Sequence, residues 1–384
     1  MAEIPVVIGS RAFDELAGCA QRLGAAPVLL IADDNTFAAA GQLLQAALEP
    51  SGLKTRVVLL HGEPRVAANE ASITRVLAAL DGKEHLLVAL GSGTLTDITR
   101  FVAYQARLPY LSAPTAASVD AFTSFTASIT IQQLKYSLPT KQAAGVFAHL
   151  PTLCEAPAAM TAAGFGDMLA KLTALADWRI ASLLTGESCD PVIYARAAAA
   201  AQVCVEQAGA IGTRRAEGVA ALAKSLMESG TCMVMAGSSR PAAGAEHSLS
   251  HFWEITHALR GLPESLHGEK TGAASVIVAG LYEALRGLTR GEAERRLKAF
   301  RPPEPDAEAA QLERIFGGAA SHILAAGASF FGKLRAQVKD VGAALLARWD
   351  EVQQIAAQVP PADELSALLE IGRASCRERV YACV

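Results

Sequence analysis

The sequence has no large excess of either charge sign, because its 384 residues include 34 basic and 38 acidic ones, a formal net charge of −4. A nucleic-acid or anionic-membrane binder needs a basic surface, which this composition does not offer. The sequence also lacks the run of about eighteen apolar residues that a membrane-spanning helix needs, and a secretory signal at its start. We therefore predict a cytoplasmic protein that binds neither nucleic acid nor membrane.

Cys-x-x-Cys pairs are absent too, although the chain has seven cysteines. A chain of this length does not need disulfide staples, so we expect buried free thiols. Two cysteines lie in residues 372–384, a tail that breaks from the amphipathic helix before it and resembles translated vector sequence. We treat this tail as non-native and leave it out of the predicted fold.

The chain is rich in apolar residues, with 51% hydrophobic against 19% charged residues, which is enough for a large core. Up to about residue 150, short apolar runs alternate with helical patterns such as 37–48 and 73–80. The apolar runs are 28–32, 56–60, 86–90 and 110–113. Continuous apolar strands separated by helices indicate a parallel sheet covered on both faces.

The second part of the chain has a different pattern. Hydroxyl residues alternate with apolar ones over 121–150, which predicts a β-hairpin or edge strands. From residue 151 onward the pattern is helical almost everywhere. We therefore predict a Rossmann-like α/β domain over 1–150 and an all-α domain over 151–371, with the site in the cleft between them.

Two loops follow predicted strands, at the edge where parallel sheets bind ligands. Residues 91–97, GSGTLTD, could bring a pyrophosphate to a helix N-terminus, although Thr94 and Asp97 could instead cap that helix. Asp33, at an earlier strand end, could hold a ribose hydroxyl or cap a helix. The small hydroxyl residues of 114–124 suit a cofactor ring or polyol, and an ordinary polar loop fits them equally.

Histidines cluster late in the sequence. His247 and His251 are four positions apart and share one helix face, and His267 opens the next helix. Upstream, Asp167 lies near the start of an otherwise apolar helix. Two imidazoles and one carboxylate suit a divalent catalytic metal. The alternative is that the histidines are satisfied polar residues and that Asp167 is a helix cap.

Several motifs carry a family resemblance from about residue 20 to about 370. They are PTAASVD at 114–120, GFGDMLAK at 164–171 with DWR at 177–179, EH at 246–247 with SHFWE at 250–254, and HGEK at 267–270. Together they resemble the superfamily of glycerol dehydrogenases, iron-containing alcohol dehydrogenases and dehydroquinate synthases, and within it the bacterial-type sn-glycerol-1-phosphate dehydrogenases. At 148–150 the chain has AHL where this family commonly has an aspartate.

The resemblance implies a dehydroquinate synthase-like fold and a role for each candidate residue. Asp167, His247 and His267 would bind the metal, and Asp120, Asp167 and His251 would be catalytic and contact the substrate. The implied cofactor contacts are Asp33, Gly91, Gly93, Thr94, Leu95, Thr96, Asp97, Thr115, Ser118 and Ser124.

The implied activity is the interconversion of dihydroxyacetone phosphate and sn-glycerol 1-phosphate by hydride transfer. It would use NAD or NADP and one divalent zinc, nickel or iron ion, and the protein would be a homodimer. Asp33 favours NAD because a carboxylate repels a 2′-phosphate, although Asn35 and Thr36 could tolerate one. No basic cluster lies beside the proposed ligands in the sequence, so the sequence alone does not identify the phosphate-binding group.

Three alternatives share parts of this pattern. A glycerol or other polyol dehydrogenase would share every ligand and differ only in the pocket for the phosphate. Dehydroquinate synthase is a lyase that typically has a glutamate ligand and a basic pocket, and Asp167 argues against it. A non-catalytic nucleotide-binding protein would be expected to have lost one of the three ligands, all of which are present.

Overall fold

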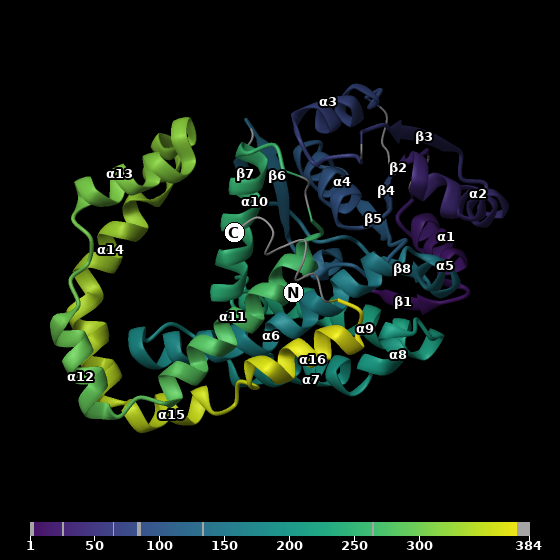
Figure 1. Ribbon diagram of the computed structural model, residues 1–384. Coiled ribbons are helices and arrows are strands. Elements are labelled where there is room, and N and C mark those ends of the chain that lie inside the picture. Colours follow the sequence, from purple (N-terminus) through teal and green to yellow (C-terminus); the bar gives the residue numbers. More distant parts are fainter. Residues whose placement is uncertain are drawn as a thin grey trace.

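A six-stranded parallel sheet forms the N-terminal half of the computed structural model (Figure 1). The structure describes residues 4–24, 27–63, 65–82, 86–132, 134–262 and 265–374, without seven of the side chains between 326 and 334. The strand order is β1-β8-β5-β4-β2-β3. The strands are β1 (Val6–Gly9), β2 (Val28–Asp33), β3 (Thr55–Leu60), β4 (Leu86–Leu90), β5 (Tyr110–Ala113) and β8 (Val146–His149).

Helices cover both faces of this sheet, as the apolar runs predict. The helices are α1 (Ala12–Arg22), α2 (Asp34–Leu48), α3 (Glu70–Ala78) and α4 (Gly93–Gln105). Leu29 and Ile31 of β2 share a core with α3 and α4, whereas Leu30 shares a second core with α1 and α2. Because successive strand residues face opposite sides, a strand buried on both faces must be apolar throughout.

The four predicted strands are confirmed, and two further strands were missed. Strands β1 and β8 have four residues each, and β1 lies at the sheet edge, where an apolar run is not required. The predicted hairpin is confirmed as β6 (Thr126–Ile131) and β7 (Leu134–Pro139), which pair antiparallel. The end of the hydroxyl-rich segment, however, leaves the hairpin and joins the main sheet as β8.

The C-terminal half is helical, as predicted. Its first helices are α5 (Leu150–Glu155), α6 (Ala158–Thr185), α7 (Pro191–Glu206), α8 (Ala208–Gly212), α9 (Ala216–Ala236), α10 (Ala245–Leu259) and α11 (His267–Arg286). Those that follow are α12 (Arg290–Ala299), α13 (Pro305–Phe316), α14 (Ala320–Ala347), α15 (Trp349–Ala356) and α16 (Ala362–Ile371). Figure 1 shows α12, α13 and α14 extending away from the rest as an arm.

Among the described residues, no helix has the length and apolarity to span a membrane. Residues 375–384 of the proposed non-native tail lie outside the described residues.

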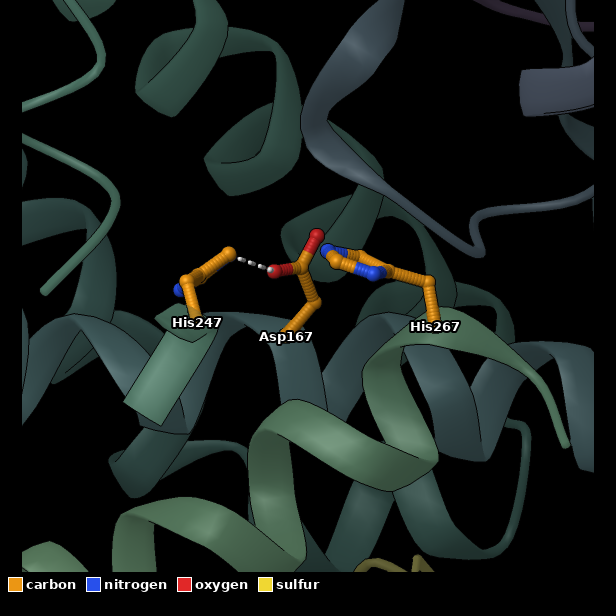
Figure 2. Close-up of side chains that lie close together, drawn as sticks. All are labelled: Asp167, His247 and His267. Carbon is orange, nitrogen blue, oxygen red and sulfur yellow. Dashed lines mark ion pairs between the residues drawn. The ribbon is translucent and has the colours of Figure 1, made fainter. Parts of the chain in front are cut away.

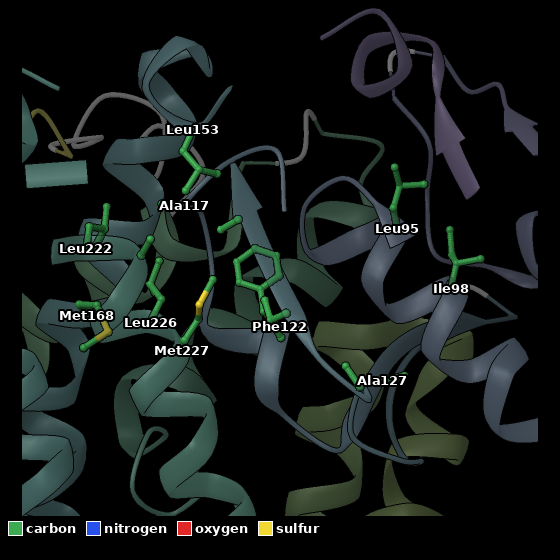
Figure 3. Packing of buried hydrophobic residues seen from close by; sticks show 14 of the residues in the cluster. Leu95, Ile98, Ala117, Phe122, Ala127, Leu153, Met168, Leu222, Leu226 and Met227 are labelled. Atoms are coloured by element: carbon green, nitrogen blue, oxygen red, sulfur yellow. The ribbon is translucent and has the colours of Figure 1, made fainter. Parts of the chain in front are cut away.

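One hydrophobic core runs from the sheet into the helical half (Figure 3). Ile98 of α4 belongs to the same cluster as Met168 of α6 and Met227 of α9. Between them lies Phe122, in the short 3-10 helix η2 (Asp120–Thr123) that follows β5. Thr123 also donates a hydrogen bond of 2.7 Å to the carbonyl of Met227. The loop after β5 is therefore fixed against both halves of the molecule.

Buried Arg100 holds the same loop from the sheet side. Its Nε donates to the Tyr110 hydroxyl (2.7 Å) and a guanidinium nitrogen donates to Asp97 Oδ1 (3.1 Å). The guanidinium also donates to the carbonyls of Ala121 and Thr126. A buried guanidinium needs such partners, because an unpaired buried charge is strongly destabilising.

Helices α6 and α11 approach closely through glycines that flank Asp167 and His267. A Cβ on Gly166 would lie 2.3 Å from the carbonyl oxygen of Gly268. One on Gly268 would lie 1.7 Å from the carbonyl oxygen of Ala163. No side chain fits at these distances, so glycine is what lets Asp167 and His267 come together.

Replacing Gly268 by alanine should push α6 and α11 apart. We expect its free energy of unfolding, measured by urea denaturation, to fall by about 1–3 kcal/mol. Gly280→Ala is the matched control, since it lies on the same helix with no atom within 4 Å of the added Cβ. Removing a helical glycine there should leave stability unchanged or raise it by about 1 kcal/mol. Equal effects of the two changes would contradict the close packing.

Candidate active site

Three side chains from three helices converge on one point (Figure 2). They are Asp167 of α6, His247 of α10 and His267 of α11, and each offers one ligand atom within 4.8 Å of the others. His247 Nε2 lies 3.7 Å from Asp167 Oδ1, and the two imidazole centroids are 5.2 Å apart. Asp167 lies inside α6 and so does not cap it. This donor set, two imidazoles and a carboxylate, is one that divalent metals accept.

A glutamate lies against the Nδ1 atom of each histidine. His247 Nδ1 is 2.8 Å from Glu246 Oε1, and His267 Nδ1 is 3.3 Å from Glu254 Oε1. Burial alone would raise the pKa of both carboxyls, but the hydrogen bonds from histidines lower it. A carboxylate on Nδ1 fixes the ring and leaves Nε2 as the ligand atom, which is the usual arrangement around metal-bound histidines.

Asp167 is fully buried and yet ionised. Burial would raise its pKa, but Lys171 and the two nearby histidines lower it to about 2. Lys171 Nζ donates to Asp167 Oδ1 at 2.8 Å, and the backbone N–H of Asp120 donates to Asp167 Oδ2 at 3.1 Å. The carboxylate is thus oriented before any ligand arrives.

Lys171 also links Asp167 to Asp120. Its Nζ lies 2.9 Å from Asp120 Oδ2, and Ser229 Oγ of α9 donates to the same oxygen at 2.8 Å. Burial opposes a charged lysine, but the two carboxylates raise the Lys171 pKa. Asp120 belongs to the loop that follows β5, so this contact joins the end of the sheet to the helical half.

His251 lies one turn beyond His247 on α10 and is more open to solvent. Its side chain is 48% exposed, and its ring centroid is 6.0 Å from that of His267. Its Nδ1 is 3.1 Å from Glu254 Oε2. It is therefore placed at the opening of the site.

The glycine turn and the loop after β5 meet at the carboxyl ends of β4 and β5. The Gly91 N–H donates to the Ala113 carbonyl, and the Thr115 N–H donates to the Gly91 carbonyl at 3.3 Å. Within the described residues no side chain caps the N-terminus of α4 at Ser92. The backbone N–H groups at Gly93 and Thr94 are therefore available to an anion.

The other proposed cofactor residues differ in what their side chains can reach. Leu95 and Thr96 are buried, and the Thr96 N–H already donates to the Ser92 carbonyl at 3.0 Å. Asp97 pairs with Arg100 and does not cap the helix, and burial raises its pKa to about 6 despite that arginine. Asp33 does cap a helix, because its Oδ1 accepts from the Thr36 N–H at 2.7 Å.

The hydroxyl residues of the loop that follows β5 are largely enclosed. Thr115, Ser118 and Ser124 are all buried. Ser124 Oγ lies 3.2 Å from Thr126 Oγ1, which gives this hydroxyl a partner within the protein.

Sequence reasoning missed the residues that support this cluster. Lys171 is four positions from Asp167 and so shares its helix face, a signal that could have found it. Ser229 and Lys135 come from distant segments and have no such signal. The sequence shows no basic cluster beside the ligands, but the fold brings Lys135 and Lys270 into contact with Glu254.

The architecture is that of glycerol dehydrogenases and iron-containing alcohol dehydrogenases. A probable glycerol dehydrogenase from Sinorhizobium meliloti 1021 superimposes with a TM-score of 0.59 at 19% identity, over 96% of this chain and 97% of that one. Residues 7–157 match the family described as iron-containing alcohol dehydrogenase.

Two relatives with higher sequence identity indicate the family within this class. The glycerol-1-phosphate dehydrogenase [NAD(P)+] of Geobacillus stearothermophilus is 37% identical over 303 residues, 78% of this chain and 75% of that protein. That of Bacillus subtilis (strain 168) is 38% identical over 282 residues, 73% of this chain and 72% of its own. The chain belongs to the glycerol-1-phosphate dehydrogenase family of oxidoreductases, as its motifs predicted.

Proposed function

We propose that the protein interconverts dihydroxyacetone phosphate and sn-glycerol 1-phosphate with NAD or NADP and one divalent metal ion. The observation that carries this proposal is the hydrogen bond from the Asp120 N–H to Asp167 Oδ2. It places the cluster of Asp167, His247 and His267 against the loop at the carboxyl edge of the sheet. Parallel sheets of this type bind their dinucleotide at that edge.

The residues of the cluster fit a catalytic metal. Asp167, His247 and His267 would hold the ion, which when bound acts as a Lewis acid that lowers the pKa of the substrate hydroxyl. Lys171 keeps Asp167 ionised, and Glu246 and Glu254 orient the two imidazoles. These contacts hold the three donor side chains in position before metal and substrate bind, so that little reorganisation of the site is needed on binding.

Asp120 and His251 are proposed to act on the substrate itself. Asp120 Oδ2 is held by Lys171 and Ser229 beside the cluster, where it can orient a substrate hydroxyl. His251 lies at the open side, where it can relay a proton or orient the substrate. Glu254 fixes its ring through Nδ1 and leaves Nε2 for that task.

The dinucleotide is proposed to bind along the two loops. Its pyrophosphate would bind the backbone N–H groups of Gly93 and Thr94, in the turn from Gly91 to Asp97 at the N-terminus of α4. Thr115, Ser118 and Ser124 would contact the nicotinamide half, which supplies or accepts the hydride. Asp33 would hold the adenosine ribose with the carboxylate oxygen that does not cap α2.

Several further points belong to the same proposal. Zinc, nickel and iron(II) all accept this donor set. The functional division of the chain falls at residue 150, between a cofactor domain (1–150) and a metal- and substrate-binding domain (151–371). We propose a cytoplasmic homodimer, in keeping with the resemblance.

The experiment that tests this function compares two carbonyl substrates. We expect kcat/KM for NADH oxidation to be about 10- to 100-fold higher with dihydroxyacetone phosphate than with dihydroxyacetone. A hydrogen bond to a charged group contributes about 1.5–3 kcal/mol, and the phosphate adds such bonds far from the reacting carbon. Equal values at matched concentrations would instead identify a glycerol dehydrogenase.

A further inference from the structure

We propose that Lys135 binds the phosphate group of the substrate, a phosphomonoester dianion, at the open side of the site. This inference rests on the proposed function, because it assigns the part of the substrate that the metal cluster does not contact. Lys135 lies on β7, and its Nζ reaches Glu254 Oε2 of α10 at 2.9 Å. Figure 1 shows the hairpin of β6 and β7 beside α10.

The position of Lys135 relative to the cluster suits a three-carbon substrate. Glu254 Oε2 contacts Lys135, and Glu254 Oε1 lies 3.3 Å from His267 Nδ1. A single carboxylate and two hydrogen bonds therefore separate Lys135 from a proposed metal ligand. In dihydroxyacetone phosphate, only a methylene and an ester oxygen separate the reacting carbonyl carbon from the phosphorus, so its phosphate must bind close to the cluster.

The charges around Glu254 favour a further anion. Lys135 and Lys270 both contact this one carboxylate, at 2.9 and 3.0 Å, and His251 lies 3.1 Å from it. Three basic side chains thus surround one carboxylate. An ammonium is a common phosphate ligand because it carries a compact charge and three rotatable donors.

Lys135 differs from the other two lysines around the site in that its side chain is accessible to a substrate. Lys171 is fully buried and Lys270 is 1% exposed, so a substrate cannot reach either. The Lys135 side chain is 29% exposed. His251 opens to the same side of Glu254, so its Nε2 can add a second donor to the phosphate.

Two other roles would use the same ammonium. Lys135 is close enough to Asp97, near the glycine turn, to lower its pKa, so the pyrophosphate of the dinucleotide is a second source of phosphate. Lys135 could also serve only as an ion pair that ties the hairpin to α10. Each role gives a different result when the charge is removed.

The test is Lys135→Met in the full-length, metal-loaded enzyme. We expect the ratio of kcat/KM for dihydroxyacetone phosphate to that for dihydroxyacetone to fall about 10- to 100-fold, as for the loss of a charged hydrogen bond. Inhibition by inorganic phosphate, competitive with the phosphorylated substrate, should weaken in the same variant, and Lys135→Arg should recover part of both. Lys298→Met is the control, since it removes the same charge from a side chain that is 75% exposed on α12.

The remaining outcomes separate the alternatives. Equal losses with both substrates would overturn the proposal and leave the ion pair between the hairpin and α10. An unchanged ratio with weaker NADH binding, measured by fluorescence titration, would assign Lys135 to the dinucleotide. A wild-type enzyme without any preference for the phosphorylated substrate would refute the proposed function itself, before any variant is considered.

Discussion

His267→Ala should lower kcat/KM for NADH oxidation by about a thousandfold or more, because Lewis-acid stabilisation is worth several kcal/mol. The substitution removes one of three donors and the only one of them on α11. Metal content, measured by mass spectrometry of the purified protein, should fall with activity.

Folding and NADH binding should survive this change, because the cluster lies at the carboxyl edge of the sheet rather than inside it. Circular dichroism and NADH fluorescence test this directly. His322→Ala is the matched control, since His322 is exposed on α14. Normal turnover by His267→Ala, or by wild type after chelator treatment, would contradict the proposed metal mechanism.

Lys171→Met should destabilise the protein by about 3–5 kcal/mol, because it leaves two carboxylates together without their buried cation. The two are those of Asp120 and Asp167, at 2.9 and 2.8 Å from the ammonium. The free energy of unfolding is measured by urea denaturation with chelator present, so that no metal compensates. Lys224→Met, at an exposed position of α9, should leave stability within about 0.5 kcal/mol of wild type.

A double-mutant cycle shows whether charge is the cause. In an Asp120→Asn background, Lys171→Met leaves only one uncompensated carboxylate. The loss of stability should then be smaller by at least about 1 kcal/mol, as is usual for residues in direct contact. The same loss in both backgrounds would mean that packing, and not the ion pairs, makes Lys171 important.

The apolar runs predict the fully buried strands of the sheet well, and its edge strand and shortest strands poorly. Strand β2 is buried on both faces, so nearly every residue had to be apolar, and the run 28–32 shows it. Strand β1 lies at the sheet edge and β8 has only four residues, so neither gives a comparable run. Helix α6 begins at Ala158, well ahead of Asp167, which the sequence placed near its start, because Ala-rich turns have no clear starting signal.

In the candidate site, too, sequence reasoning finds residues that are close together in the sequence and misses contacts between residues that are far apart in it. The histidine spacing and the motif around Asp167 indicated which side chains converge. Some contacts that orient them are local, since Lys171 is four positions from Asp167 and Glu246 is next to His247. The long-range contacts were out of reach, because Lys135 and Glu254 are 119 positions apart and Asp120 and Ser229 are 109 apart. Such pairs depend on how the hairpin packs against α10 and how α9 packs against the loop after β5. The hydrophobic pattern of a helix or strand contains no information about that packing.

The most direct test of the central claim is the metal content of three purified proteins: wild type, Asp167→Asn and His247→Ala. The claim is that Asp167, His247 and His267 together hold one ion at the carboxyl edge of the sheet. Mass spectrometry should find about one divalent ion per wild-type chain and far less than one in each variant, because loss of a direct ligand weakens binding by more than the 10- to 100-fold typical of outer contacts. A fully active wild type without metal, or variants that keep a full ion, would contradict the account.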